Sequence, residues 1–143
     1  MILCDVNVLV YAYRTEAPEH ARYSAWLNET TVSDQAYGIS ELVLSRFLRI
    51  VTHRRGMTTP APLESALGFA AALREQPNAV PLSPGPRHWT IFERLCREVG
   101  ATGNLAPDAY LAALAIEHGA ELATADADFA RFPGLRWRHP LAA

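Results

Sequence analysis

Short apolar runs alternate with longer amphipathic stretches along the chain, and this alternation limits the possible folds more than any other feature. The sequence predicts strands at residues 2–4, 36–40, 79–82, 120–125 and 135–139. It predicts helices at residues 6–14, 16–29, 41–55, 61–76, 85–100 and 108–119. Because alternating strands and helices are typical of parallel sheets covered by helices, we expect an α/β fold with a mainly parallel central sheet.

Several predicted helices carry residues that favour helix ends. Pro18 suits the start of helix 16–29, and Ser40 suits the N-cap of helix 41–55. Gly100 suits the end of helix 85–100, because glycine readily adopts the left-handed conformation found there. These residues support the element boundaries that the apolar pattern indicates.

Length and composition indicate one globular unit. A chain of 143 residues with 50% hydrophobic and 20% charged residues is ordinary for a single domain. We therefore expect residues 1–143 to form one domain. Cys4 and Cys96 are too few for a disulfide framework, so we expect two reduced, buried thiols.

The first residues argue against export or membrane insertion. The stretch MILCDVNVLVYAYRTE has no basic leader, and Asp5 and Asn7 interrupt its apolar run. We expect a cytoplasmic protein with no membrane partner.

Four acidic residues are expected to meet at one edge of the sheet. Asp5 and Asp126 lie at or just past the ends of predicted strands, and Glu41 and Asp108 lie in the first turns of predicted helices. Either of the last two, taken singly, is also explained by the helix dipole. Two like charges about 4 Å apart repel by roughly 4 kcal/mol at an effective dielectric of 20. A cluster of four therefore requires a cation.

The candidate ligands are oxygen donors, which favours Mg²⁺ or Mn²⁺ over zinc. Such ions suit phosphodiester hydrolysis, because they activate a water molecule and neutralise developing charge. Asn7 either caps a helix or orients Asp5, and Thr124 either favours the strand or binds a metal-bound water. Asp128 either supports the metal or caps the next turn. The histidines are scattered along the chain: His20, His53, His88, His118 and His139.

Charge is informative by position. The net charge of −2 predicts no strong non-specific attraction to nucleic acid, yet the chain without the acids discussed above is net basic. Arg14 follows Asp5, and Arg54 and Arg55 follow Glu41 on one predicted helix together with Arg46, Arg49 and His53. These residues are candidates for steering RNA phosphates along the rim of the site, although cations at a helix end are favoured in any case.

Three blocks of the sequence carry a family resemblance: MILCDVNVLVYAYR, GISELVLSRFLRIVTH and NLAPDAYLAALAIEHGAELATADADFARFPGLRW. They contain D-x-N after the first strand, S-E-L opening a helix, P-D-A-Y, and T-x-D-x-D-F, in that order. Together these blocks resemble PIN-domain proteins, specifically VapC-type toxins of toxin–antitoxin pairs. The resemblance covers nearly the whole chain and implies a PIN-like three-layer α/β/α domain.

The resemblance also implies an activity and a set of site residues. It implies a Mg²⁺- or Mn²⁺-dependent endoribonuclease in which Asp5, Glu41, Asp108 and Asp126 match the family's acids. Thr124 matches the small hydroxyl residue before the fourth acid.

The same resemblance implies two protein partners. The family forms homodimers and is held inactive by a cognate antitoxin whose C-terminal segment lies across the active-site groove. Candidate antitoxin contacts are Tyr11, Trp26, Phe47 and Leu48, for each of which core packing is the alternative.

Three other functions are alternatives for a chain with an aspartate after its first strand. Phosphoryl-transfer enzymes of the haloacid-dehalogenase type have a second aspartate where Asn7 stands, and they need a later lysine. Response-regulator receivers need that lysine too, and this chain contains none. The remaining alternative is a catalytically weak PIN-like domain that acts as an RNA- or protein-binding module.

Overall fold

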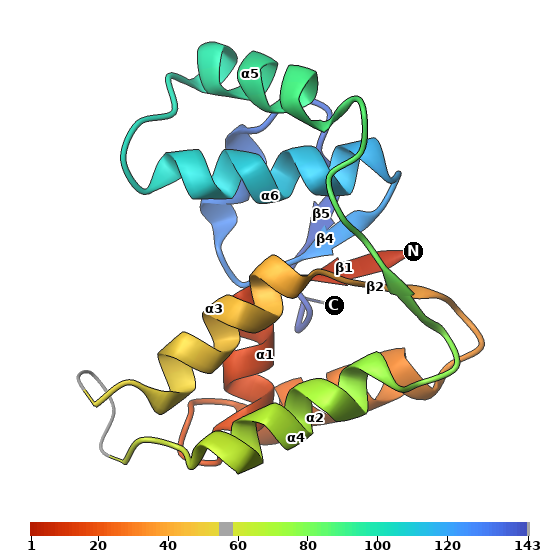
Figure 1. Cartoon of the computed structure of the whole chain (residues 1–143), viewed down its shortest axis with the longest axis vertical. Helices are drawn as coiled ribbons and strands as arrows, with labels where there is room; N and C mark the ends of the chain where they lie inside the picture. The colour runs from red at the N-terminus through yellow and green to blue at the C-terminus, as the bar shows by residue number, and fades with distance from the viewer. Residues whose placement is uncertain (55–58, 143) are drawn as a thin grey trace.

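The computed structural model describes residues 1–54 and 59–142 (Figure 1). Its strands are β1 (Ile2–Cys4), β2 (Tyr37–Ile39), β3 (Ala79–Pro81), β4 (Glu121–Ala123) and β5 (Trp137–Arg138). Its α-helices are α1 (Val6–Tyr13), α2 (His20–Val32), α3 (Glu41–Thr52), α4 (Leu63–Arg74), α5 (His88–Val99) and α6 (Leu105–Glu117), and a 3-10 helix, η1, spans Ala127–Arg131. Each predicted strand and helix is present in the described residues.

The strands form one sheet in the order β3-β2-β1-β4-β5, and every pairing within it is parallel. In the central strand β1, Leu3 lies opposite Gly38 of β2 and Leu122 of β4. Parallel pairing brings the carboxyl ends of all the strands to one edge of the sheet. The predicted α/β class is thereby confirmed.

Helices cover both faces of the sheet (Figure 1). Helices α5 and α6 pack together on one side, and α1 to α4 form the layer on the other side. The buried core between these layers includes Leu3 and Leu122 from the sheet, Phe47 from α3, and Leu95 and Leu111 from α5 and α6. This three-layer arrangement agrees with the sequence-based expectation.

The helix ends show how local sequence fixes the elements. The Ser40 hydroxyl accepts a hydrogen bond from the Val43 backbone N–H at 3.3 Å, as its capping role requires. Gly100 ends α5 with a positive φ of 62°. The predicted start of the second helix is wrong, because α2 begins at His20 and Glu19 before it has a φ of 58°. A turn around Pro18 therefore precedes that helix.

No helix within the described ranges is both long and apolar enough to cross a membrane. Cys4 and Cys96 are both free and partly buried. Burial raises the pKa of the Cys4 thiol to about 12, with a smaller contribution from the charge of Asp5. The Cys4 thiol therefore stays protonated at neutral pH.

Candidate active site

The carboxyl edge of the sheet brings together aspartates from distant parts of the chain. Asp5 follows β1 and caps α1, and Asp126 follows β4 and caps η1. The two strand ends are joined by a hydrogen bond from the Asp5 backbone N–H to the Ala123 carbonyl at 2.9 Å. Asp108 lies in the first turn of α6.

Asp5 is held in place by three neighbours. Asp5 is only 6% exposed to solvent. One carboxylate oxygen accepts the Val6 backbone N–H at 2.7 Å. The other accepts the Thr124 hydroxyl at 2.8 Å and the Asn7 side-chain amide at 3.3 Å. A buried carboxylate fixed in this way cannot swing out to solvent without losing these hydrogen bonds.

Asn7 and Thr124 also link Asp5 to the end of β4. The Asn7 amide donates to the Thr124 hydroxyl at 3.2 Å, and its carbonyl oxygen accepts the Ala125 backbone N–H at 3.1 Å. The Asp126 backbone N–H donates to the Thr124 hydroxyl oxygen at 3.0 Å. The geometry gives both side chains a positioning role within the cluster.

The charges of the aspartates act on one another. The pKa of Asp108 is raised to about 6, first by burial and then by the negative charges of Asp5, Asp126 and Asp128, whereas Arg46 acts in the opposite direction. Burial also raises the pKa of Asp5; its hydrogen bonds and Arg46 act in the opposite direction, and Asp126 adds to the rise. Asp5, Asp108 and Asp126 are therefore near enough for their charges to act on one another.

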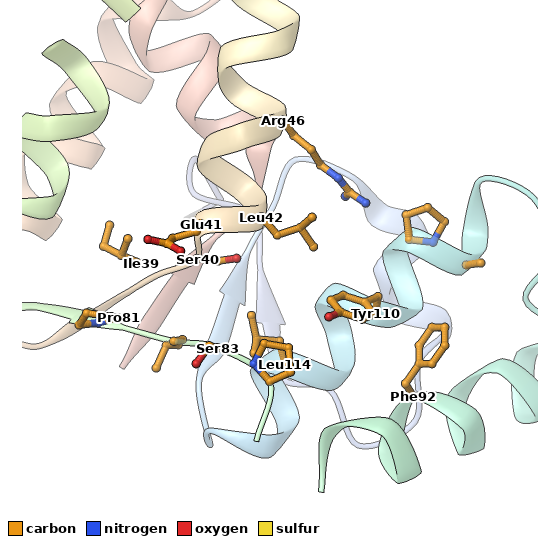
Figure 2. Close-up of a pocket in the computed structure, with 14 residues that line it drawn as sticks. Ile39, Ser40, Glu41, Leu42, Arg46, Pro81, Ser83, Phe92, Tyr110 and Leu114 are labelled. Atoms are coloured by element: carbon orange, nitrogen blue, oxygen red, sulfur yellow. The ribbon is translucent and has the colours of Figure 1, made fainter. Parts of the chain in front are cut away.

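Glu41 lies apart from this cluster. Its carboxylate forms an ion pair with Arg74 of α4 at 2.8 Å, and its side chain is 79% exposed. Figure 2 shows the carboxylate turned away from Arg46. The structure therefore brings three of the four predicted acids together and leaves Glu41 bound to an arginine.

Asp128 is not the cap of the turn after β4, because Asp126 is the N-cap of η1, and a role of Asp128 at the metal stays a prediction. Its backbone N–H donates to the Asp126 carboxylate at 2.9 Å in the first turn of η1. Its exposed side chain lies 3.9 Å from the Arg131 guanidinium, yet its charge still reaches Asp108. Asp128 is thus part of the turn and part of the negative field.

The donor chemistry of the cluster fits a hard divalent cation, because Asp5, Asp108 and Asp126 offer only carboxylate oxygens and repel one another without a positive charge between them. Within residues 1–54 and 59–142, no three acidic, histidine or cysteine side chains are gathered closely enough to hold an ion as they stand. Side-chain rotations, including one by Glu41, would be needed to complete a coordination shell.

The arginines predicted to contact RNA differ in how far they are exposed. Arg14 is 4% exposed, and its guanidinium donates to the Val51 carbonyl at 2.7 Å and the Thr59 carbonyl at 2.9 Å. This buried position contradicts the prediction that Arg14 contacts RNA. Arg54 is exposed beyond the end of α3, and Arg55 lies outside the described residues.

Arg46 is the residue whose importance the sequence reasoning missed. In the sequence Arg46 is one member of a basic run, whereas in the structure its charge acts on both Asp5 and Asp108. No local signal distinguishes Arg46 from the other arginines of the predicted helix 41–55. Among the candidate antitoxin contacts, Phe47 is fully buried, and Tyr11, Trp26 and Leu48 are partly buried against the core.

The fold and the acidic edge agree with a match to a known family. The PIN domain model matches residues 2–135. The chain belongs to the PIN-domain family, and within it to the VapC ribonucleases, as the following relatives show. The VapC ribonuclease Mb2897 of Mycobacterium bovis is 46% identical over 141 residues, which cover 99% of this chain and 96% of that protein. Ribonuclease VapC25 of Mycobacterium tuberculosis is 41% identical over 140 residues, covering 98% of this chain and 99% of that protein.

A solved structure supports the fold independently. The crystal structure of VapBC2 from Rickettsia felis, bound to a DNA fragment from its promoter, matches with a TM-score of 0.69 at 22% identity. The match covers 96% of this chain and 98% of that chain. At this level of identity the likeness concerns the fold.

Proposed function

We propose that this protein is a Mg²⁺- or Mn²⁺-dependent endoribonuclease toxin that hydrolyses RNA phosphodiester bonds. The observation that carries the proposal is Asp5, buried and fixed by hydrogen bonds beside Asp108, whose pKa is raised to about 6 partly by neighbouring acids. The membership of the chain among VapC ribonucleases supports RNA as the substrate.

The residues that would hold the metal are Asp5, Asp108 and Asp126, with Glu41 completing the set. When bound, the ion would activate a water molecule and stabilise charge on the phosphate oxygens. Thr124 and Asn7 hold the Asp5 carboxylate in a fixed orientation. Arg46 offsets part of the repulsion among the acids. These catalytic and metal-binding roles are predictions.

A cognate antitoxin is the proposed regulator. The Rickettsia felis structure is of a VapBC pair, which supports the same kind of partner here. The homodimer implied by the family resemblance and the cytoplasmic location stay predictions.

Cleavage of a mixed RNA pool by the purified protein tests the activity. We expect cutting with Mg²⁺ or Mn²⁺, its loss in EDTA, and its return when the metal is restored. Cutting that persists unchanged in EDTA would contradict a metal-dependent enzyme. RNA retained on the protein without being cut would favour the binding-module alternative, which has some support in the ion pair of Glu41 with Arg74.

The Glu41–Arg74 pair leads to a separate prediction on metal affinity. Because Glu41 must leave Arg74 to reach a bound ion, Arg74→Ala should tighten Mn²⁺ binding, by up to about fivefold, since an exposed ion pair contributes at most about 1 kcal/mol. Isothermal titration calorimetry measures this affinity directly. Arg97→Ala, which breaks the exposed pair with Glu93 on α5, is the control and should change nothing. Weaker Mn²⁺ binding by Arg74→Ala would argue against Glu41 as a ligand.

A further inference from the structure

A groove of about 600 Å³ lies beside the acidic cluster, between α3, α6, α5 and the segment that follows β3. Figure 2 shows its walls: Leu42 and Arg46 come from α3, Tyr110 and Leu114 from α6, and Phe92 from α5. Most of the lining is apolar, and its polar side chains are those of Ser40, Glu41, Arg46, Ser83 and Tyr110. Of the residues given roles above, Glu41 and Arg46 line this groove, whereas its apolar walls and Tyr110 have been given none.

The α6 wall of the groove carries a supported aromatic ring. Tyr110 contacts the His88 ring edge-on, with centroids 4.4 Å apart, and the Phe92 ring at 5.6 Å and 72°. His88 lies within hydrogen-bonding distance, 3.0 Å, of the Tyr110 carbonyl oxygen. These contacts hold the ring in place, so a flat ligand could pack against it with little loss of side-chain freedom.

Arg46 places a positive charge between this groove and the acids. Its charge acts on Asp5 and Asp108, but among the described residues its guanidinium makes no direct ion pair or hydrogen bond. Figure 2 shows its side chain extending from α3 toward α6. A partly buried guanidinium without a direct partner is suited to a phosphate, which it can bind through paired hydrogen bonds.

We propose that this groove binds one unstacked base of the RNA substrate, with the base against Tyr110 and the adjoining phosphate on Arg46. The inference rests on the proposed ribonuclease function and adds a subsite to it. Proteins recognise single-stranded RNA by stacking splayed bases on aromatic side chains while cationic side chains hold the backbone. The volume falls in the range of pockets that enclose one small ligand.

Charge favours RNA over a polypeptide in this groove. A basic antitoxin segment aimed at the acids would meet Arg46 of the groove lining as a like charge, whereas a phosphate would be attracted to it. The other charged residue of the lining, Glu41, is already paired with Arg74. Pro107, the chain neighbour of Asp108, also lines the groove, so a base bound there would place the adjoining phosphate near the start of α6.

The test measures the affinity of a fluorescently labelled single-stranded RNA that contains the cleavage site found in the pool assay. All variants are made in the Asp5→Asn background with Mg²⁺ present, so the RNA stays intact. Tyr110→Ala should weaken binding about 5- to 150-fold, the range for losing one stacked base. Tyr110→Phe, which keeps the ring, should bind within about twofold of the parent.

Two further measurements locate the base and the phosphate. An abasic RNA that lacks the stacked base should bind the parent protein as weakly as intact RNA binds Tyr110→Ala. The Tyr110→Ala variant should bind the abasic RNA and the intact RNA with equal affinity. Arg46→Gln should lower the slope of log Kd against log salt by about 0.7, the value for one phosphate contact on a single strand. Arg22→Gln on α2, which loses an exposed pair with Glu19, is the matched control and should leave the slope unchanged.

Leu42→Glu guards against a variant that fails to fold, because Leu42 is 36% exposed. It places a negative charge in the groove and should also weaken RNA binding. Unchanged RNA affinity in both Tyr110→Ala and Leu42→Glu would overturn the subsite. The subsite would also be overturned if these variants changed the oligomeric state, measured by analytical ultracentrifugation, while keeping their RNA affinity. The groove would then be an interface between two copies of the chain. If Asp5→Asn cleaves RNA as well as the wild type, it is the proposed function that fails.

Discussion

Replacing Asp5 with asparagine is expected to reduce metal-dependent RNA cleavage by at least about 100-fold. Loss of an outer-shell partner of a metal site already costs about 10- to 100-fold in metal affinity or activity, and Asp5 is proposed as a direct ligand. The change removes one negative charge while keeping the size of the side chain. Asparagine is also a good N-cap residue, so the hydrogen bond to the Val6 N–H and helix α1 should persist.

The matched control for this prediction is Asp34→Asn. Asp34 is exposed and precedes β2, which places it at the opposite edge of the parallel sheet from the acidic cluster. The Asp34→Asn variant should cleave RNA at the same rate as the wild type when both proteins are purified identically. Initial rates on the RNA pool, together with circular dichroism of each protein, provide the comparison. Equal rates for Asp5→Asn and the wild type would indicate a contaminating nuclease and remove the support for a metal site at Asp5.

The position of the acids could be predicted because it follows from local sequence and from parallel topology. Asp5 and Asp126 come directly after short apolar strands, and Asp108 comes directly after the proline in the first turn of α6. Parallel strands end at one edge, so residues of this kind meet without any knowledge of packing. The same logic placed Ser40 at the start of α3.

The failures come from contacts between residues far apart in the sequence. Arg14 is buried because its guanidinium reaches the carbonyls of Val51 and Thr59, and no local pattern announces such acceptors. Glu41 is drawn away from the aspartates by Arg74, which lies on another helix. Side-chain direction in these cases depends on tertiary partners, whereas backbone position depends largely on the apolar pattern.

The role of Arg46 also depends on tertiary neighbours that the sequence does not reveal. In the sequence Arg46 is one of four arginines in the predicted helix 41–55, all of which fit a solvated helix face. In the structure it is distinguished by its neighbours, because its charge reaches the acids and its side chain lines the groove. Its value as a candidate phosphate ligand therefore rests on geometry.

Replacing Asp108 with asparagine is expected to have opposite effects on activity and on stability. Cleavage should fall about as far as in Asp5→Asn, because a proposed metal ligand is lost. Without metal, the variant should melt higher than the wild type at pH 7.5, because one member of a mutually repelling cluster has become neutral. After allowance for solvent screening of this partly exposed group, the gain is about 1 kcal/mol, or about 3–4 °C in Tm for a domain of this size.

The pH dependence of that stability difference follows from the direction of the shift. The pKa of Asp108 is raised from 3.8 to about 6 by burial and by the neighbouring acids, so folding favours the protonated carboxyl group. In the wild type, this contribution of Asp108 to the free energy of unfolding is fully present below about pH 4 and is lost as the pH rises through about 6. Asparagine cannot ionise, so the stability of the metal-free variant relative to the metal-free wild type should increase across this pH interval.

Thermal melts from pH 4 to 7.5, with EDTA and with Mn²⁺, measure both effects. In EDTA, the difference in Tm between Asp108→Asn and the wild type should grow with pH and level off above about pH 7. Saturating Mn²⁺ should raise the Tm of the wild type more than that of the variant, because binding to the folded state stabilises it. A variant that melts lower than the wild type in EDTA at pH 7.5 would contradict the repulsion on which the metal site is proposed, since removing a charge would then have cost stability.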